Sequence, residues 1–132
     1  MADFRKIINK EKALIGMVHL HALPGTPKSK KTPQQIIDTA INEANTLVEF
    51  GFDAVLLENM HDTPYMLREV GPEIVATMTA AMQAVVDSVD VPVGIQILAG
   101  ANKAALAVAH ATGAHFIRAE GFAFASIADE GL

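Results

Sequence analysis

Polar side chains close each of four short apolar runs in this sequence, and they are the residues best suited to chemistry. In chain order they are His19, His21, Glu58, Asn59, Asp62, Gln96, Arg118 and Glu120. Parallel α/β folds bind ligands at the carboxyl ends of their strands, where the loops gather. A sheet that served only as scaffold would not need polar residues at every run end. The pattern therefore predicts a binding or catalytic site at this edge.

The charged members of the set suit anion recognition and proton transfer. Arg118 could hold a carboxylate or phosphate in the two-pronged geometry of its guanidinium. Glu58 or Glu120 could act as general base if shielded from water, while His19 polarises or protonates a carbonyl. Gln96 would orient the substrate or join this network. We expect Arg118 and Glu120 to be mostly buried near the other strand ends, although an internal ion pair between them explains the same residues.

Asn59 and Asp62 are candidates for substrate binding at the end of the second run. Asp62 opens an Asp-Thr-Pro segment. An aspartate in such a turn accepts hydrogen bonds from backbone amides two residues on, and proline fixes the following φ angle. Turn formation is thus the first interpretation of Asp62, and ligand contact the second.

His19 and His21 raise the question of a metal. Two residues apart in an extended strand, they point to the same face, as paired imidazoles do in metal-dependent hydrolases. A zinc site needs three or four protein ligands, yet the end of the fourth run adds no His or Asp and the chain has no cysteine. Glycine-rich dinucleotide and phosphate-loop motifs are also missing from the sequence. We therefore expect no metal and no other cofactor.

The runs themselves predict buried strands that alternate with helices. Nearly continuous apolar runs are typical of strands in parallel sheets. Strands are expected over 13–20, 52–59, 91–98 and 115–121. Helices are expected to begin at a Thr32–Gln35 capping box, at Pro72 and at Asn102, with glycines 51 and 113 closing the first and third. Such alternation predicts right-handed βαβ units around a parallel sheet.

Two α/β folds fit this order of elements. A flavodoxin-like open sheet needs about this length, whereas a (β/α)8 barrel needs roughly 250 residues. Against the open sheet, no helix follows the fourth run to cover its face. The barrel predicts the strand order 1-2-3-4, and the open sheet predicts 2-1-3-4. In either case we expect residues 1–132 to form a single domain.

Composition limits the partners. The chain has 132 residues, 51% of them hydrophobic, and a formal net charge of −5. Without a long Lys/Arg cluster, this acidic balance argues against binding to nucleic acid or to anionic membranes. No apolar run is long enough for a signal peptide or a membrane span. We expect a cytoplasmic protein that binds a small molecule, with a homo-oligomer as one option for its assembly.

Longer motifs around these residues resemble the BtpA family. The matching segments are 16–25, 57–64, 94–107 and 113–121, in the family's order. The resemblance implies a (β/α)8 barrel of the ribulose-phosphate-binding type. It also implies that this chain is about the first half, strands 1 to 4 with three helices, because family members continue beyond the motif at 129–132. His21 is not expected throughout the family, which weakens the metal hypothesis.

The resemblance leaves function open, since the family has no settled activity. Its name comes from a factor in photosystem I biogenesis, and a bacterial relative lies among sugar-metabolism genes. This version of the motifs looks like the branch found in non-photosynthetic organisms. Our leading hypothesis is an enzyme, or former enzyme, that acts on a phosphorylated or carboxylated metabolite. The alternatives are a non-catalytic assembly factor on a barrel scaffold and a metal-dependent hydrolase that uses His19 and His21.

Overall fold

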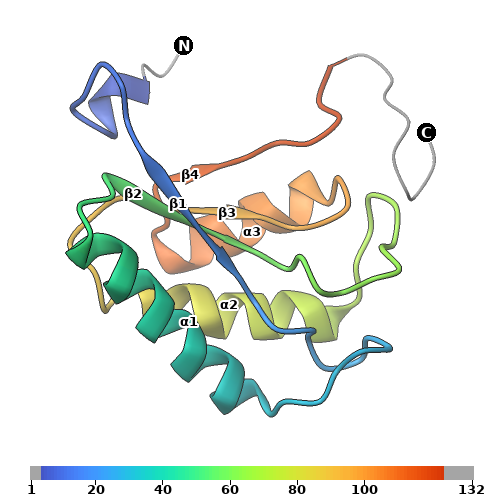
Figure 1. Ribbon diagram of the computed structural model, residues 1–132. Coiled ribbons are helices and arrows are strands. Elements are labelled where there is room, and N and C mark those ends of the chain that lie inside the picture. Colours follow the sequence, from blue (N-terminus) through green and yellow to red (C-terminus); the bar gives the residue numbers. More distant parts are fainter. Residues whose placement is uncertain (1–3, 124–132) are drawn as a thin grey trace.

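A computed structural model describes residues 4–123, in which strands and helices alternate (Figure 1). Residues 129–132, used in the family motif, lie outside this range. The strands are β1 (Ile15–His19), β2 (Ala54–Glu58), β3 (Val93–Gln96) and β4 (Phe116–Ile117). The helices are α1 (Pro33–Glu49), α2 (Pro72–Val86) and α3 (Asn102–Thr112), preceded by a short 3-10 helix, η1 (Phe4–Lys6).

The four strands form one parallel sheet in the order β1-β2-β3-β4. β1 pairs along its whole length with β2, from Ile15 opposite Ala54 to His19 opposite Glu58. This order confirms the 1-2-3-4 prediction. It rules out the flavodoxin-like alternative for the described residues, because β1 does not lie beside β3. The arrangement is consistent with the first half of a (β/α)8 barrel.

The predicted helix ends are confirmed in detail. Thr32 accepts a hydrogen bond from the Gln35 amide, and the Gln35 side chain accepts one from Thr32, so the capping box at α1 is complete. α2 begins at Pro72, and α3 runs from Asn102 to a glycine at 113 whose φ is 71°. A left-handed residue at this point is the usual way to end a helix, and glycine adopts it without strain.

The fourth strand is shorter than the 115–121 expected. β4 ends at Ile117, and beyond it the chain turns onto the loop before α3. There the Asn102 side chain bonds both the N–H and the C=O of Glu120, at 3.0 and 2.8 Å. A side chain has thus taken the backbone groups of Glu120 that a longer strand would have offered to a neighbour. The η1 helix had no counterpart in the sequence analysis.

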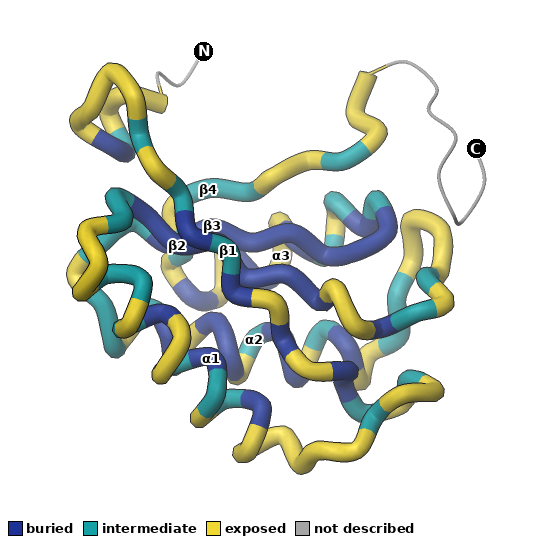
Figure 2. The backbone as a smooth tube through the Cα atoms, viewed as in Figure 1, coloured by how far each residue is buried: buried dark blue, intermediate teal, exposed yellow. Residues whose placement is uncertain are grey.

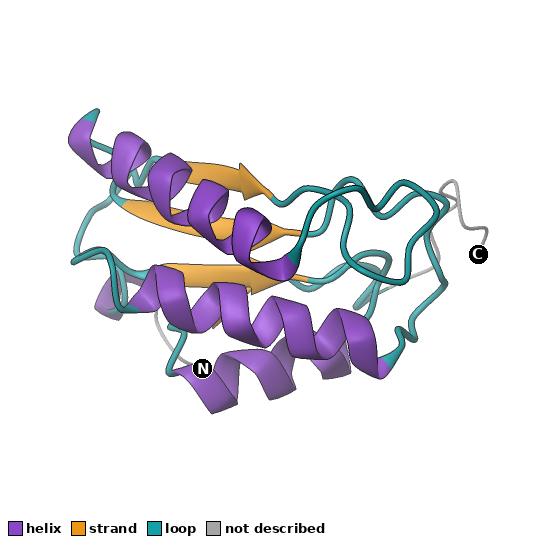
Figure 3. Cartoon of the chain, turned by 90° about the horizontal axis from the view of Figure 1, so that it is seen from below, coloured by secondary structure: helices purple, strands orange, loops and turns teal. Residues whose placement is uncertain are grey.

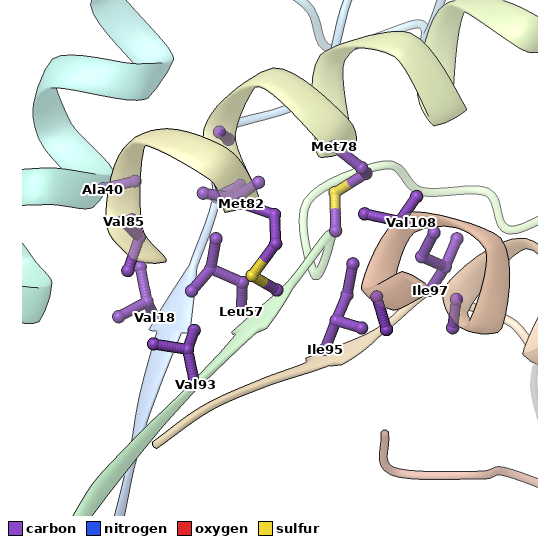
Figure 4. Packing of buried hydrophobic residues seen from close by; sticks show 14 of the residues in the cluster. Val18, Ala40, Leu57, Met78, Met82, Val85, Val93, Ile95, Ile97 and Val108 are labelled. Carbon is purple, nitrogen blue, oxygen red and sulfur yellow. The ribbon is translucent and has the colours of Figure 1, made fainter. Parts of the chain in front are cut away.

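The core lies between the sheet and the helices, which all cover the same face (Figure 3). Alternate strand residues point into it, among them Val18, Leu57 and Ile95, and meet Met78 and Met82 of α2 (Figure 4). These side chains are fully buried. Figure 2 shows β2 and β3 buried in the middle of the sheet, with β1 and β4 at its two edges more exposed. Burial of such aliphatic side chains is the main force that holds the helices to the sheet.

The opposite sheet face, here called the open face, is not covered by any of the three α-helices of the described residues. Near its amino end it carries Phe116, whose ring packs edge-on against Phe4 of η1 with the centroids 5.5 Å apart. Phe116 also lies over Gly94, where a Cβ would come within 2.2 Å of the ring. Glycine at 94 is therefore required for this ring to cover β3. The carboxyl end of the same face carries the polar residues.

Candidate functional site

Three polar side chains share one line across the open face at the carboxyl ends of the strands. His19 is in register with Glu58, and Glu58 with Gln96. Residues in register on parallel strands point to the same side of the sheet. We call His19, Glu58 and Gln96 the rim row. The sequence prediction that these strand ends lie together is confirmed by the strand register.

Within the rim row, His19 and Glu58 form a close pair. His19 Nε2 lies 3.3 Å from Glu58 Oε2. The Glu58 side chain is 6% exposed, whereas that of His19 is 39% exposed. A buried carboxylate against an accessible imidazole fixes the orientation of the ring. The pair can therefore support acid–base chemistry on a ligand that approaches the open face.

Gln96 is tied to Glu120. Gln96 Nε2 donates to Glu120 Oε2 at 3.3 Å, and the Gly100 amide donates to the same oxygen at 2.8 Å. Gln96 is almost fully buried, and its Oε1 has no hydrogen-bond partner among residues 4–123. The Glu120 carboxylate thus lies against the small-residue loop that precedes α3.

The prediction of a mostly buried Arg118–Glu120 pair is wrong. Arg118 is exposed and Glu120 only half-buried. Arg118 does bond the sheet through its backbone, since its amide donates to Ile95 O at 3.0 Å. The physical reason for its exposure is that β4 is an edge strand of the described sheet, so nothing on its far side covers the side chain. Glu120 instead turns back toward Gln96 and Gly100.

Asn59 and Asp62 form a buried bracket that joins three loops. Asn59 Oδ1 accepts from the Leu98 amide at 2.7 Å, and its Nδ2 donates to Asp62 Oδ2 at 2.9 Å. Asp62 Oδ1 accepts from the Leu23 amide at 2.7 Å. Asn59 is 1% and Asp62 6% exposed. The loops that follow β1, β2 and β3 are thereby locked together.

The partners of Asp62 differ from those that the turn motif predicted. Its carboxylate accepts from Leu23, 39 residues away, rather than from amides just after it. Burial raises the pKa of Asp62 above its usual value, and the hydrogen bonds from Leu23 and Asn59 partly oppose that rise. The polar groups of Asn59 and Asp62 are thus committed to internal bonds. The substrate-binding role expected of the two residues would therefore be indirect: they hold in place the three loops that they join.

His21 is exposed, two residues beyond His19. Within the part of the chain that the structure describes, no group of three or more His, Cys, Asp or Glu side chains could hold a metal ion. A metal-dependent hydrolase would need ligands from outside this range. Nor does any helix of the described residues have the length and apolar character to cross a membrane.

A cavity of about 250 Å³ lies on the other side of the bracket, and the sequence analysis did not find it. It is open to solvent on one side and is lined by the loops after β1 and β2, the first turn of α2 and Leu98. Its walls come from segments far apart in the sequence, so no local motif predicts it. The nearest signal is the cluster of proline and glycine residues in both loops.

Comparison with known proteins agrees with the fold. The model of the BtpA family matches residues 10–132. An uncharacterized mitochondrial protein of Caenorhabditis elegans is 46% identical over 132 residues, which cover 96% of this chain and 48% of that protein. An uncharacterized protein of Archaeoglobus fulgidus is 42% identical over 122 residues, 92% of this chain and 49% of that protein.

A third relative carries a functional name. It is the photosystem I biogenesis protein BtpA of Synechocystis, 32% identical over 130 residues, 98% of this chain and 45% of that protein. The chain thus spans about half the length of the relatives it matches. Since the family model covers nearly all of its residues, the chain belongs to the BtpA family.

Proposed function

We propose that this protein is an enzyme that acts on a small phosphorylated or carboxylated metabolite at the rim row. One observation carries the proposal: the buried Glu58 carboxylate lies 3.3 Å from an imidazole that stays accessible. A carboxylate buried to this extent needs a partner, and the partner of Glu58 is an imidazole that a ligand can reach. The pair is also placed where parallel α/β folds bind their ligands.

In this proposal His19 exchanges the proton and Glu58 positions it. His19 has the exposed side chain, so it is the member of the pair that can reach a substrate. Glu58 contacts Nε2 of the ring and so orients it toward the substrate. The role of general base, expected from the sequence at Glu58 or Glu120, thus moves to His19, and Glu58 becomes a positioning residue.

Arg118 and Gln96 would bind the substrate, with Glu120 beside them. The Oε1 of Gln96 has no partner among the described residues but is buried, so the Gln96 side chain would have to turn toward the open face to accept a hydrogen bond from a substrate hydroxyl group. Glu120 fixes the Gln96 amide, so we assign it a positioning role rather than that of a base. Arg118 follows Ile117, the last paired residue of β4, and its exposed guanidinium suits a phosphate or carboxylate.

Binding and turnover in the full chain test this proposal. Sugar phosphates of three to six carbons, small hydroxy acids and the matching uncharged sugars would be screened by thermal shift, and each compound that binds would be followed by NMR for conversion. We expect Arg118→Met to lower the affinity for the charged compounds only. Lys31→Met, a control at an exposed position, should leave that affinity unchanged. Equal binding of charged and uncharged compounds, or no loss in Arg118→Met, would contradict the anion role.

The second candidate is a non-catalytic assembly factor, favoured by the name of the Synechocystis relative, a photosystem I biogenesis protein. On this hypothesis the rim row is only structural. No compound of either class would bind, and variants of His19 and Arg118 would match the wild type in every binding measurement. The same screen therefore separates the two functions.

A further inference from the structure

We propose that the 250 Å³ cavity beside the Asn59–Asp62 bracket is a second binding site, for a small primary amine on an apolar body. The proposal does not rest on the enzymatic function assigned to the rim row. It stands on the size of the cavity, on the character of its walls and on the charges that line it.

The cavity has room for a ring-sized ligand. An apolar cavity of about 150 Å³ is enough to bind benzene, so one of 250 Å³ can hold a ring with a short substituent. Much of its wall is apolar, with Met66, Val70, Ile74 and Leu98 among its residues. Tyr65 adds an aromatic side chain whose hydroxyl is anchored to Met60 O at 2.6 Å. Such walls with a few polar groups are typical of small-molecule sites.

The charges select the sign of the ligand. Two carboxylate side chains line the cavity, those of Asp62 and Glu73. No Lys, Arg or His is among the lining residues. Asp62 already uses both oxygens inside the protein. Glu73 is exposed, which leaves its carboxylate as the group that can meet a cation. An anionic ligand would face two carboxylates without a compensating charge.

Two glycines leave the space that the Glu73 side chain occupies. A Cβ at Gly71 would lie 2.3 Å from Glu73 Oε1, and a Cβ at Gly25 would lie 2.7 Å from Glu73 Cγ. Residues with side chains at either position would therefore push the carboxylate away. The two glycines leave the space that it fills at the cavity wall. The exposed Glu73 side chain at the cavity wall can therefore place its carboxylate against an ammonium group.

The cavity is separated from the rim row by a single step along β2. Glu58 faces the open side of the sheet, whereas the next residue, Asn59, lines the cavity. Ile74, another wall residue, belongs to the core under the helices. A ligand in the cavity therefore does not depend on what covers the open face.

Three probes of equal size and different charge test the proposal: benzylamine, benzyl alcohol and benzoate, titrated into the full chain and followed by amide NMR. We expect benzylamine to bind most tightly and to shift signals around Tyr65 and Val70, with benzoate the weakest. Glu73→Gln should lower the affinity for benzylamine about fivefold, as expected for loss of an exposed charge pair. The affinity for benzyl alcohol should change by no more than about twofold.

Two further variants complete the design. Glu49→Gln removes an exposed carboxylate at the end of α1, away from the cavity, and should change nothing. Met66→Ala trims an exposed part of the wall and should weaken benzylamine and benzyl alcohol alike. The proposal is overturned if benzoate binds as tightly as benzylamine, if Glu73→Gln has no effect on benzylamine, or if none of the three probes binds. Turnover at the rim row would be unaffected by that failure.

Discussion

Glu58 and Asn59 are neighbours in the chain, both are buried polar residues, and they face opposite sides of the sheet. Asn59 makes hydrogen bonds to Leu98 and Asp62 and is satisfied within the protein. Glu58 has a 3.3 Å contact with an accessible histidine. The difference teaches that burial alone does not separate structural from functional polar groups. What separates them is whether the partner is itself enclosed or open to a ligand.

The largest effect on stability is expected on the Asn59 side. Asn59→Ala leaves the buried Leu98 amide without its acceptor and Asp62 without one of its donors. Each buried unsatisfied group costs about 1–3 kcal/mol, so we expect a loss of about 3 kcal/mol in the free energy of unfolding, measured in urea. The exposed Asn42→Ala on α1 should change it by less than about 0.5 kcal/mol.

A smaller loss of stability is expected from a substitution on the open face, at Gly94. Gly94→Ala forces the Phe116 ring off β3, because the new Cβ would lie 2.2 Å from it. Overpacking of this kind costs about 2 kcal/mol. Phe116→Leu in the same chain should recover part of the loss. If the double variant is no more stable than Gly94→Ala, the ring is not what requires glycine at this position.

Glu58→Gln should cost less than Asn59→Ala, about 1 kcal/mol or below by urea unfolding. The amide keeps the shape of the side chain and can still bond the imidazole, so one buried charge is removed rather than left unpaired. A loss as large as that of Asn59→Ala would break the comparison. It would mean that Glu58 is as much a part of the scaffold as the bracket.

The smallest effect distinguishes two aspartates by pH. Burial raises the pKa of Asp62, so between its unfolded value near 3.8 and its folded value the native state holds more protons, and stability falls as pH rises. The pKa of Asp53 is lowered by its hydrogen bond from the Leu14 amide and by Lys10. Its contribution is therefore present above pH 3.8 and is lost as pH falls through the folded value.

Unfolding curves of Asp62→Asn and Asp53→Asn against wild type, from pH 7 downward, measure both contributions. As the pH falls, the free energy of unfolding of wild type should rise relative to that of Asp62→Asn. Relative to Asp53→Asn, wild type should lose its extra stability below pH 3.8. Parallel curves for the two variants would show that the two carboxylates do not differ in environment.

Sequence reasoning went furthest where the determinants are local. The capping box at Thr32, the glycine that ends α3 and the apolar strands each follow from a few adjacent residues, and the alternation of elements then sets the strand order. The common edge of His19, Glu58 and Gln96 follows from that order. Partners distant in the chain could not be found in this way, which is why the bond from Leu23 to Asp62 and the cavity were missed.

Arg118 shows the other limit of the sequence. Its burial was inferred from the inner position that a strand end has in a closed barrel. In the described residues β4 pairs with β3 alone, so the side chain is exposed. A strand pattern reports which face a residue occupies, but burial also depends on what lies beside the strand.

Turnover by His19→Gln and His21→Gln is the most direct test of the central claim that the rim row is an active site. With the first metabolite that the wild-type full chain converts, we predict that His19→Gln loses about a hundredfold in kcat, the range of a lost general acid–base group. His21→Gln, two residues away and outside the pair, should stay within about twofold. Equal loss in both variants, or full activity of His19→Gln, would contradict the account.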